Sequence, residues 1–325
     1  MEIKAKSVRF DRYIPILTIQ DGVVVSKRGE LTVGWEVALP PLCSVTEDGY
    51  EDMLESLSSA VRSLGQGFIV HRQDIYLKDS YHAEKTGGFL SESYERHFDA
   101  RDHLTHRQYL FLTLALKDAP SRGISSSGAF GISFPKGELL AKDLATLLSK
   151  ATEFASVISG RGGYGLRQLD DRELAALVHR HTCLHSSDGV FSDLEPFPDK
   201  VKCGPRTLWA YSISESRALP SLLNPSQRAD SLSSSSSEIR LSTAAAIGPL
   251  LDCEHMVNTY VFTLNQGETM REMGGRKRRM TSMSQNAENK VGAEELEEFA
   301  DLSHKESLTC VKAHTNILVW GEEHQ

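Results

Sequence analysis

The densest set of side chains that could bind a metal lies at alternate positions near the middle of the chain: His179, His181, Cys183 and His185. In a helix, residues four apart share a face, so these four divide into two pairs that point about 160° apart. A structural zinc ion needs four ligands around one point, which two opposed pairs do not supply. We therefore expect the end of a polar helix, with histidines near its negative pole, and no metal. In a strand the four would share a face, so a small metal-dependent hydrolase stays open as an alternative.

A looser group combines His97, His103 and His106 with Glu92 and Glu95. Histidine and carboxylate side chains are the usual general acids and bases of enzymes. Spacing alone pairs no nucleophile with a base there, and the sequence contains no GxSxG motif for a nucleophilic serine. We expect these histidines to have hydrogen-bonding roles.

The sequence also lacks the loop that holds a triphosphate. It contains no Gly-Lys dipeptide, so the motif GxxxxGK[ST] is absent. Gly160, Gly162 and Gly165 match GxGxxG, but a dinucleotide site needs a strand before that motif and a helix after it. Here the glycines follow a predicted helix, where they serve as a C-cap and turn. We expect no cofactor and no catalytic function for this chain.

One basic cluster is a candidate contact for phosphate or for a partner: Arg271, Arg276, Lys277, Arg278 and Arg279. It precedes an acidic stretch between residues 294 and 301, which predicts a solvated pair of helices whose charges offset one another. No aromatic side chains interleave the cluster, so stacking on bases is not supported. Direct binding of nucleic acid is not expected.

Composition places the chain among ordinary globular proteins. It has 325 residues, 40% hydrophobic and 25% charged, with a net charge of −8. No stretch approaches the ~20 apolar residues of a membrane-spanning helix, and the first residues do not resemble a secretory signal. The five cysteines are far apart and form no CxxC pair, which suits a reducing cytoplasm.

The positions of these residues depend on the elements that carry them. The chain is organised around residues 88–116, whose second half alternates aromatic and leucine side chains as a strand covered on both faces does. We expect loops at 120–135 and 231–237. Strands are expected at 14–19, 23–26, 31–39, 68–77, 107–116, 207–213, 238–246, 256–264 and 308–320, and helices from Thr46 to Gly65 and at 137–159, 170–185 and 268–306, the last broken near Gly292.

This order predicts an α+β protein with two ferredoxin-like (βαββαβ-type) antiparallel units and covering helices, the second unit incomplete. The first subdomain is expected at residues 1–186 and the second at 187–325. In the last strand, Leu318 and Trp320 form an apolar face without an obvious cover. Exposed apolar faces promote association, so we expect weak self-association through this end.

Five blocks occur in a characteristic order: FIVHRQDIYL, GFLSESYERHFDARDHLTHRQYLFLTLA, LRQLDDREL, IGPLLDCEHMVNTYVF and VKAHTNILVW. Together they resemble the N-terminal region of the TraG-type conjugation ATPases of conjugative transposons, which are relatives of the VirB-type secretion ATPases. The resemblance runs from about Ile14 to Trp320. The His179–His185 group is not part of it.

The resemblance implies a role for the chain. In the family, the Walker motifs lie in a C-terminal motor domain beyond the matched segment, so no catalytic residue carries over. The implied function is a docking scaffold that links the motor to the secretion channel during DNA transfer. Its implied partners are the channel subunits and its own motor domain, at the cytoplasmic face of the inner membrane, without spanning it.

Overall fold

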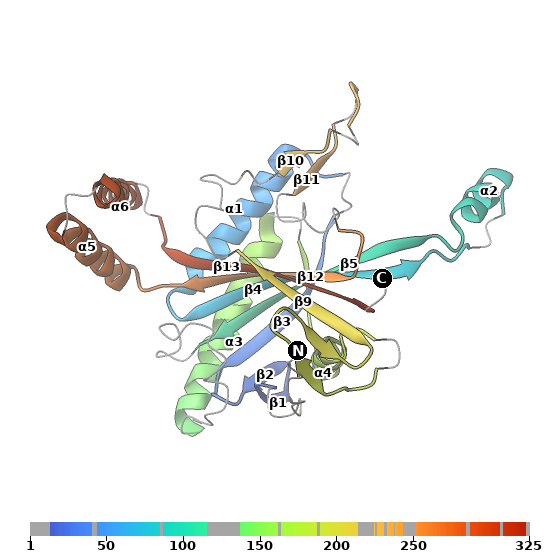
Figure 1. Cartoon of the computed structure of the whole chain (residues 1–325), viewed down its shortest axis with the longest axis horizontal. Helices are drawn as coiled ribbons and strands as arrows, with labels where there is room; N and C mark the ends of the chain where they lie inside the picture. Colours follow the sequence, from blue (N-terminus) through green and yellow to red (C-terminus); the bar gives the residue numbers. More distant parts are fainter. Residues whose placement is uncertain are drawn as a thin grey trace.

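One antiparallel sheet forms the centre of the molecule (Figure 1). The computed structural model describes residues 14–40, 44–84, 87–115, 137–161, 164–186, 189–213, 224, 226–230, 233–236, 238–242, 251–283, 287–305 and 308–322. Its strands follow the order β1-β2-β3-β5-β4-β12-β13-β9-β8-β7, and β6 pairs with β3 beyond the end of β2. They are β1 (Ile16–Gln20), β2 (Val23–Ser26), β3 (Leu31–Ala38), β4 (Phe68–Ser80), β5 (Asp102–Leu114), β6 (Gly165–Gln168), β7 (Leu194–Pro196), β8 (Val201–Cys203), β9 (Arg206–Ser212), β12 (His255–Thr263) and β13 (Val311–Glu322).

Both halves of the chain contribute to this sheet. β12 pairs with β4 from His255↔Tyr76 to Phe262↔Ile69, so strands on either side of residue 186 are direct neighbours. A small second sheet joins β10 (Ser226–Arg228) to β11 (Arg240–Ser242). The predicted mixture of helices with an antiparallel sheet is confirmed. The sheet is continuous across the predicted subdomain boundary.

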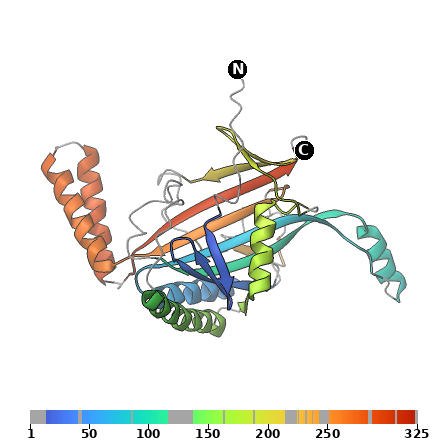
Figure 2. The ribbon, with the colours of Figure 1, turned by 90° about the horizontal axis from the view of Figure 1, so that it is seen from below.

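Helices cover both faces of the sheet (Figure 2). On one face, α1 (Glu47–Leu64) and α3 (Gly137–Arg161) pack side by side against the apolar side chains of β3, β4 and β5. Lys150 of α3 donates to the carbonyl of Ser63 in α1 at 2.7 Å. On the other face, α4 (Asp171–Thr182) covers a smaller core with Leu174 and Leu177. The alternation of β5 explains both layers, because Leu110 and Leu112 face the first core and Tyr109 faces the second.

Local signals set the helix ends as the sequence predicts. The Thr46 hydroxyl accepts from the amide of Gly49 at the start of α1. Asp170 and Glu173 form a complete capping box at the start of α4. α1 ends before Gly65, whose φ of 77° suits glycine. In β3, a Cβ at Gly34 would lie 2.8 Å from the ring of Phe111, so a side chain cannot fit there.

Two helical elements project from opposite ends of the sheet (Figure 1). β4 and β5 extend beyond the body as a two-stranded ribbon that carries α2 (Phe89–Phe98) at its tip, and we call ribbon and helix the arm. At the other end, α5 (Gln266–Met283) and α6 (Ala287–Lys305) form a hairpin between β12 and β13. The predicted helix break near Gly292 is wrong, because Gly292 lies inside α6, where an added Cβ would lie 3.5 Å from Met280 of α5.

Two other predicted elements differ in extent from those in the structure. The helix predicted at 170–185 ends at Thr182, and the strand predicted at 238–246 is described only as β11. The loop at 120–135 lies outside the described residues. Within the described ranges, no helix combines the length and the apolar character needed to cross a membrane.

Candidate functional sites

A buried carboxylate lies on the same face of the sheet as α1 and α3. The Asp74 side chain on β4 is only 4% exposed. It accepts hydrogen bonds from Arg72 Nε at 2.8 Å and Nη2 at 3.2 Å, from His106 Nε2 at 2.9 Å and from Gln108 Nε2 at 2.7 Å. Burial by itself raises the pKa of this carboxyl, but the hydrogen bond from His106 and the charge of Arg72 outweigh it and hold the pKa below its usual value.

Three aromatic rings continue this cluster across the strands. The rings of His106 on β5, Tyr76 on β4 and His255 on β12 stack in a row, with centroids 4.4 and 4.5 Å apart. His255 Nδ1 donates to the carbonyl of Cys253 at 2.7 Å, while its Nε2 is buried and has no partner among the described residues. Desolvation lowers the pKa of His255, which favours the neutral ring.

The carboxylate and histidine have the geometry that orients a general base, but the rest of a catalytic site is missing from the part of the chain that is described. His106 bonds there to no serine, threonine or cysteine. The adjoining cavity, lined by Arg72, Gln108 and Tyr164 among others, measures about 20 Å³, which holds about one water molecule. This cluster therefore satisfies buried charge and joins strands, and the adjoining cavity is too small to hold a substrate.

A second polar row crosses the opposite face of the sheet. Asn258 on β12 accepts from Gln73 at 3.1 Å, contacts His71 Nε2 at 2.9 Å and donates to Asn316 on β13 at 3.0 Å. His181 of α4 reaches this row, with Nε2 2.9 Å from Gln73 Oε1. Burial lowers the pKa of His71 to about 4, against the opposing effect of its bond to Asn258. The row ties β4, β12, β13 and α4 together.

The four predicted metal-binding candidates do not converge. His179 meets the ring of Phe191 at 4.6 Å, while His181 points into the polar row just described. Cys183 follows the last turn of α4 with its Sγ 3.5 Å from the carbonyl of Arg180. Among the described residues, no group of three histidine, cysteine or carboxylate side chains is placed to hold a metal.

His185 instead packs against the last strand. Its ring stacks on Trp320 with centroids 5.6 Å apart, and burial, with nearby positive charges, lowers its pKa to about 3. Trp320 is 3% exposed and, like Leu318, belongs to the core beneath α4. The prediction that this face lacks a cover is wrong. Leucines of α4 pack on it, and β9 pairs with β13 beside it. Self-association through Trp320 loses its physical basis.

The other predicted groups are separated or neutralised. His97 lies on α2 and His103 on the ribbon of the arm, while His106 belongs to the Asp74 cluster. The basic cluster lies along α5, where Lys277 pairs with Glu297 of α6 at 2.7 Å. Its four arginines are exposed: Arg271, Arg276, Arg278 and Arg279.

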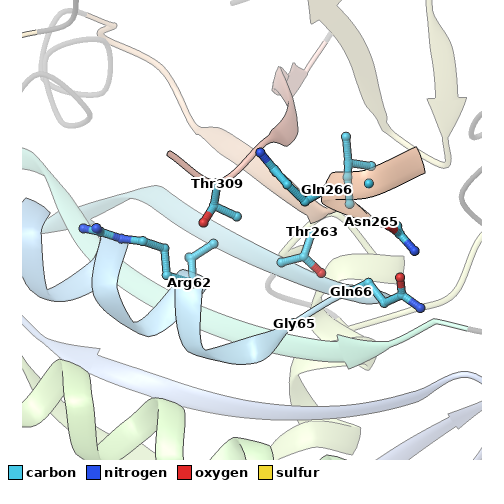
Figure 3. A pocket seen from close by; sticks show the side chains of 10 residues that line it. Arg62, Gly65, Gln66, Thr263, Asn265, Gln266 and Thr309 are labelled. Atoms are coloured by element: carbon cyan, nitrogen blue, oxygen red, sulfur yellow. The ribbon is translucent and has the colours of Figure 1, made fainter. Parts of the chain in front are cut away.

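A shallow cavity of about 290 Å³ lies where the α5–α6 hairpin joins the sheet (Figure 3). The Gln266 side chain fixes this junction, since it donates to Ser303 and Leu308 and accepts from the amide of Cys310. Arg62 is the sole charged side chain in the lining. The described residues of this lining therefore offer no paired acid and base.

The tip of the arm carries the two most exposed large hydrophobic side chains among the described residues, Phe89 and Leu90. No side chain of α2 is buried, and Phe89, Leu90 and Tyr94 are 85%, 81% and 59% exposed. The tip is nevertheless held in place. The Tyr81 hydroxyl donates to Glu95 at 2.8 Å, and backbone bonds join Tyr81 to Ala100 and Arg101. An ordered helix that exposes aromatic side chains at the end of a ribbon is typical of a docking element.

Sequence reasoning missed this element. The expected helices did not include these residues, and the sequence did not indicate the two-strand pairing that lifts them away from the sheet. One signal was available in the sequence: Leu90, Tyr94 and Phe98 keep helical spacing between two predicted strands.

Comparison with known proteins gives one partial match. Residues 3–54 match a family model described as a domain of unknown function, B. Theta Gene description (DUF3875). The described part of this segment comprises β1 to β3 and the first turns of α1. No curated protein matches the chain.

Proposed function

We propose that this chain is a non-catalytic docking region of a conjugative-transfer ATPase of the TraG type, which links the motor to the secretion channel. The single observation that carries a docking role is the arm. An apolar helix tip, 85% exposed at Phe89, stands on a ribbon whose pairing continues to Ser80↔Asp102. The ordered sequence blocks that resemble this family support the identity of the complex.

Two polar networks among the described residues support a scaffold role. The Asp74 cluster and the Asn258 row are closed networks in which side chains bond to one another across strands. Such networks fix the strand register and the position of α4. A rigid sheet of this kind suits a scaffold that must hold two projections at fixed positions.

The finer architecture belongs to the same proposal. The order β6-β3-β5-β4, with α1 and α3 on one face, is that of a ferredoxin-like unit and supports the first subdomain, residues 1–186. The segment β12-α5-α6-β13 would be the incomplete second unit, within residues 187–325. We place the protein at the cytoplasmic face of the inner membrane, in contact with channel subunits and with its own motor domain.

A transfer assay tests the docking role. The double substitution Leu90→Ser and Tyr94→Ser, introduced into the conjugative element that encodes the chain, is expected to lower DNA transfer at least tenfold. Both side chains are exposed, so the fold should be retained. Leu148→Ser, at a leucine of α3 that is 42% exposed, is the matched control and should leave transfer unchanged. Normal transfer by the arm variant would refute the proposed role of the arm.

A measurement of nucleotide binding distinguishes a docking region from a motor. The sequence lacks the motif GxxxxGK[ST], which supplies the ring of amides and the lysine that cradle a triphosphate, so we expect no appreciable binding or hydrolysis of Mg-ATP. Isothermal titration measures this directly. Micromolar affinity with steady release of phosphate would contradict the assignment of a non-catalytic role.

A further inference from the structure

A group of arginines lies along α5, on a projection that the proposed role of the arm does not involve. The α5–α6 hairpin extends from one end of the sheet, away from the body of the molecule (Figures 1 and 2). Four exposed arginines form what we call the arginine surface: Arg271, Arg276, Arg278 and Arg279. With about 3.6 residues per turn, they span about 160° around the axis of the helix.

The arginine surface faces away from α6. On the opposite side of α5, Lys277 pairs with Glu297 of α6 at 2.7 Å. Met280 lies on that side too, since a Cβ added at Gly292 of α6 would lie 3.5 Å from it. The sequence predicts that the carboxylates of α6 offset the whole basic cluster. Among the described residues, Lys277 is the one member of that cluster that pairs with them.

The arginine surface can therefore bind an anion. Within the described ranges, none of its four side chains forms an ion pair, and their one hydrogen bond runs from Arg278 Nε to the carbonyl of Gly274 at 3.3 Å. Glu268 and Glu272 lie within the same arc of α5, so four positive charges stand against two negative ones. Guanidinium groups bind phosphate oxygens through paired hydrogen bonds, which makes phosphate the fitting anion.

The other side chains of α5 indicate which phosphate-bearing partner fits. The helix has no aromatic side chain, so the bases of a single strand have nothing to stack on. Helices that lie on a membrane combine a basic face with an apolar one, and the described side chains of α5 include no exposed large hydrophobic group. Positive charge on both flanks, at Arg278 and at Arg276, instead matches a groove with phosphates on both sides.

We propose that the arginine surface binds the phosphate backbone of duplex DNA without reading its sequence. The major groove of DNA, about 12 Å wide, admits an α-helix and has a phosphate backbone along each side. The net charge of −8 opposes the approach of a polyanion, so the contact is local and weak. We expect a dissociation constant of about 10⁻⁴–10⁻⁶ M at physiological salt. The sequence alone did not favour this partner, because the acidic stretch was expected to offset the basic cluster.

The salt dependence of binding tests this contact. Fluorescence anisotropy of a short labelled DNA duplex of mixed sequence, titrated with the full chain, gives the association constant. With one phosphate contact per arginine, its logarithm should fall against the logarithm of salt concentration with a slope of about −3.6, or about 150-fold between about 50 and 200 mM salt. A triple variant should reduce the slope to about −0.9 and weaken binding at least about tenfold at low salt. It carries Arg271→Gln, Arg278→Gln and Arg279→Gln.

Two control variants separate the arginine surface from net charge. The first removes the same charge at exposed arginines of α2, α4 and β10 and should bind like the unchanged chain. It carries Arg96→Gln, Arg172→Gln and Arg228→Gln. The second places lysine at the three test positions and should keep the steep salt dependence, because lysine also binds phosphate as a point charge. Circular dichroism establishes that each variant is folded.

Several results would overturn the proposal. Equal losses in the glutamine variant and the first control would reduce the effect to net charge, and unchanged binding in the glutamine variant would place the DNA elsewhere. Tighter binding of the corresponding single strand would contradict a duplex partner. Binding to vesicles that contain phosphatidylglycerol, without binding to the duplex, would assign the surface to a membrane. The arm variant Leu90→Ser/Tyr94→Ser should bind the duplex normally, so the docking role of the arm and the arginine surface can fail separately.

Discussion

Replacing Asp74 with asparagine removes the negative charge at the centre of the sheet while keeping the shape of the side chain. The carboxylate accepts four hydrogen bonds from three side chains, and Arg72 and His106 lose their anionic partner. Gln108 Nε2, 2.7 Å from Asp74 Oδ1, would meet either the remaining oxygen or the new amide. The Asp74→Asn substitution therefore leaves the charge of Arg72 without its anionic partner.

The expected loss in the free energy of unfolding is large. Removing one partner of a buried ion pair destabilises a protein by about 3–5 kcal/mol. The Arg72 and His106 side chains are 19% and 22% exposed, so water can partly solvate them. We therefore expect the lower end of that range, about 3 kcal/mol. This is a substantial fraction of the 5–15 kcal/mol that typically separates folded from unfolded protein.

The effect depends on pH in a defined direction. The pKa of Asp74 is lower in the folded chain than in the unfolded one, so the unfolded chain takes up the proton first as the pH falls. Its stabilising contribution is complete above the ordinary aspartate pKa of about 3.9 and is lost as the pH falls through the lower folded value. The difference between Asp74→Asn and the unchanged chain should therefore narrow below about pH 4.

Urea unfolding at pH 7 and pH 3 measures both effects. Glu153→Gln is the matched control, because it breaks a surface pair with Lys150 in which Glu153 is 46% exposed. Such pairs contribute about 0.2–1 kcal/mol. If Asp74→Asn lowers the free energy of unfolding at pH 7 by no more than the control does, the carboxylate does not hold the sheet together and the reasoning is refuted.

Three further predictions follow from the same structure. Trp320→Ala should lower the free energy of unfolding by about 3–5 kcal/mol in urea titrations, because the indole is buried; a change below about 1 kcal/mol would contradict its place in the core. Tyr81→Phe removes the bond to Glu95 and should speed hydrogen exchange in α2 alone, as measured by mass spectrometry, so that unchanged exchange there would show that the bond does not hold the arm tip. Purified protein should contain no stoichiometric zinc, and His181→Ala should lower stability without changing the metal content. About one zinc per chain, lost on that substitution, would revive the hydrolase alternative.

Local patterns in the sequence determined the elements. The alternation of Tyr109 and Leu110 along β5 identified a strand buried on both faces, because side chains of a strand point alternately to its two sides. Thr46 and Asp170 marked helix starts, because their side chains bond amides only three residues away. These interactions depend on a few neighbouring residues and can be read without knowledge of the fold.

The candidate sites were decided by contacts between distant residues. Asp74 meets His106 only because β4 pairs with β5, and nothing in the spacing of the two residues indicates it. The four-ligand pattern from His179 to His185 lost its regularity where α4 ends, since Leu184 and His185 both adopt positive φ, 50° and 55°. That turn directs His185 onto Trp320.

The burial of Trp320 shows most clearly which features local sequence patterns determine and which depend on contacts between distant residues. Alternation along the last strand correctly gave Leu318 and Trp320 a common face. Whether that face met water depended on β9, which pairs with β13 from Asn316↔Ser212 to Glu322↔Arg206, and on α4, more than a hundred residues upstream. Strand pairing uses backbone groups that every residue carries, so the sequence states that a strand exists and only the tertiary structure decides which neighbours cover it.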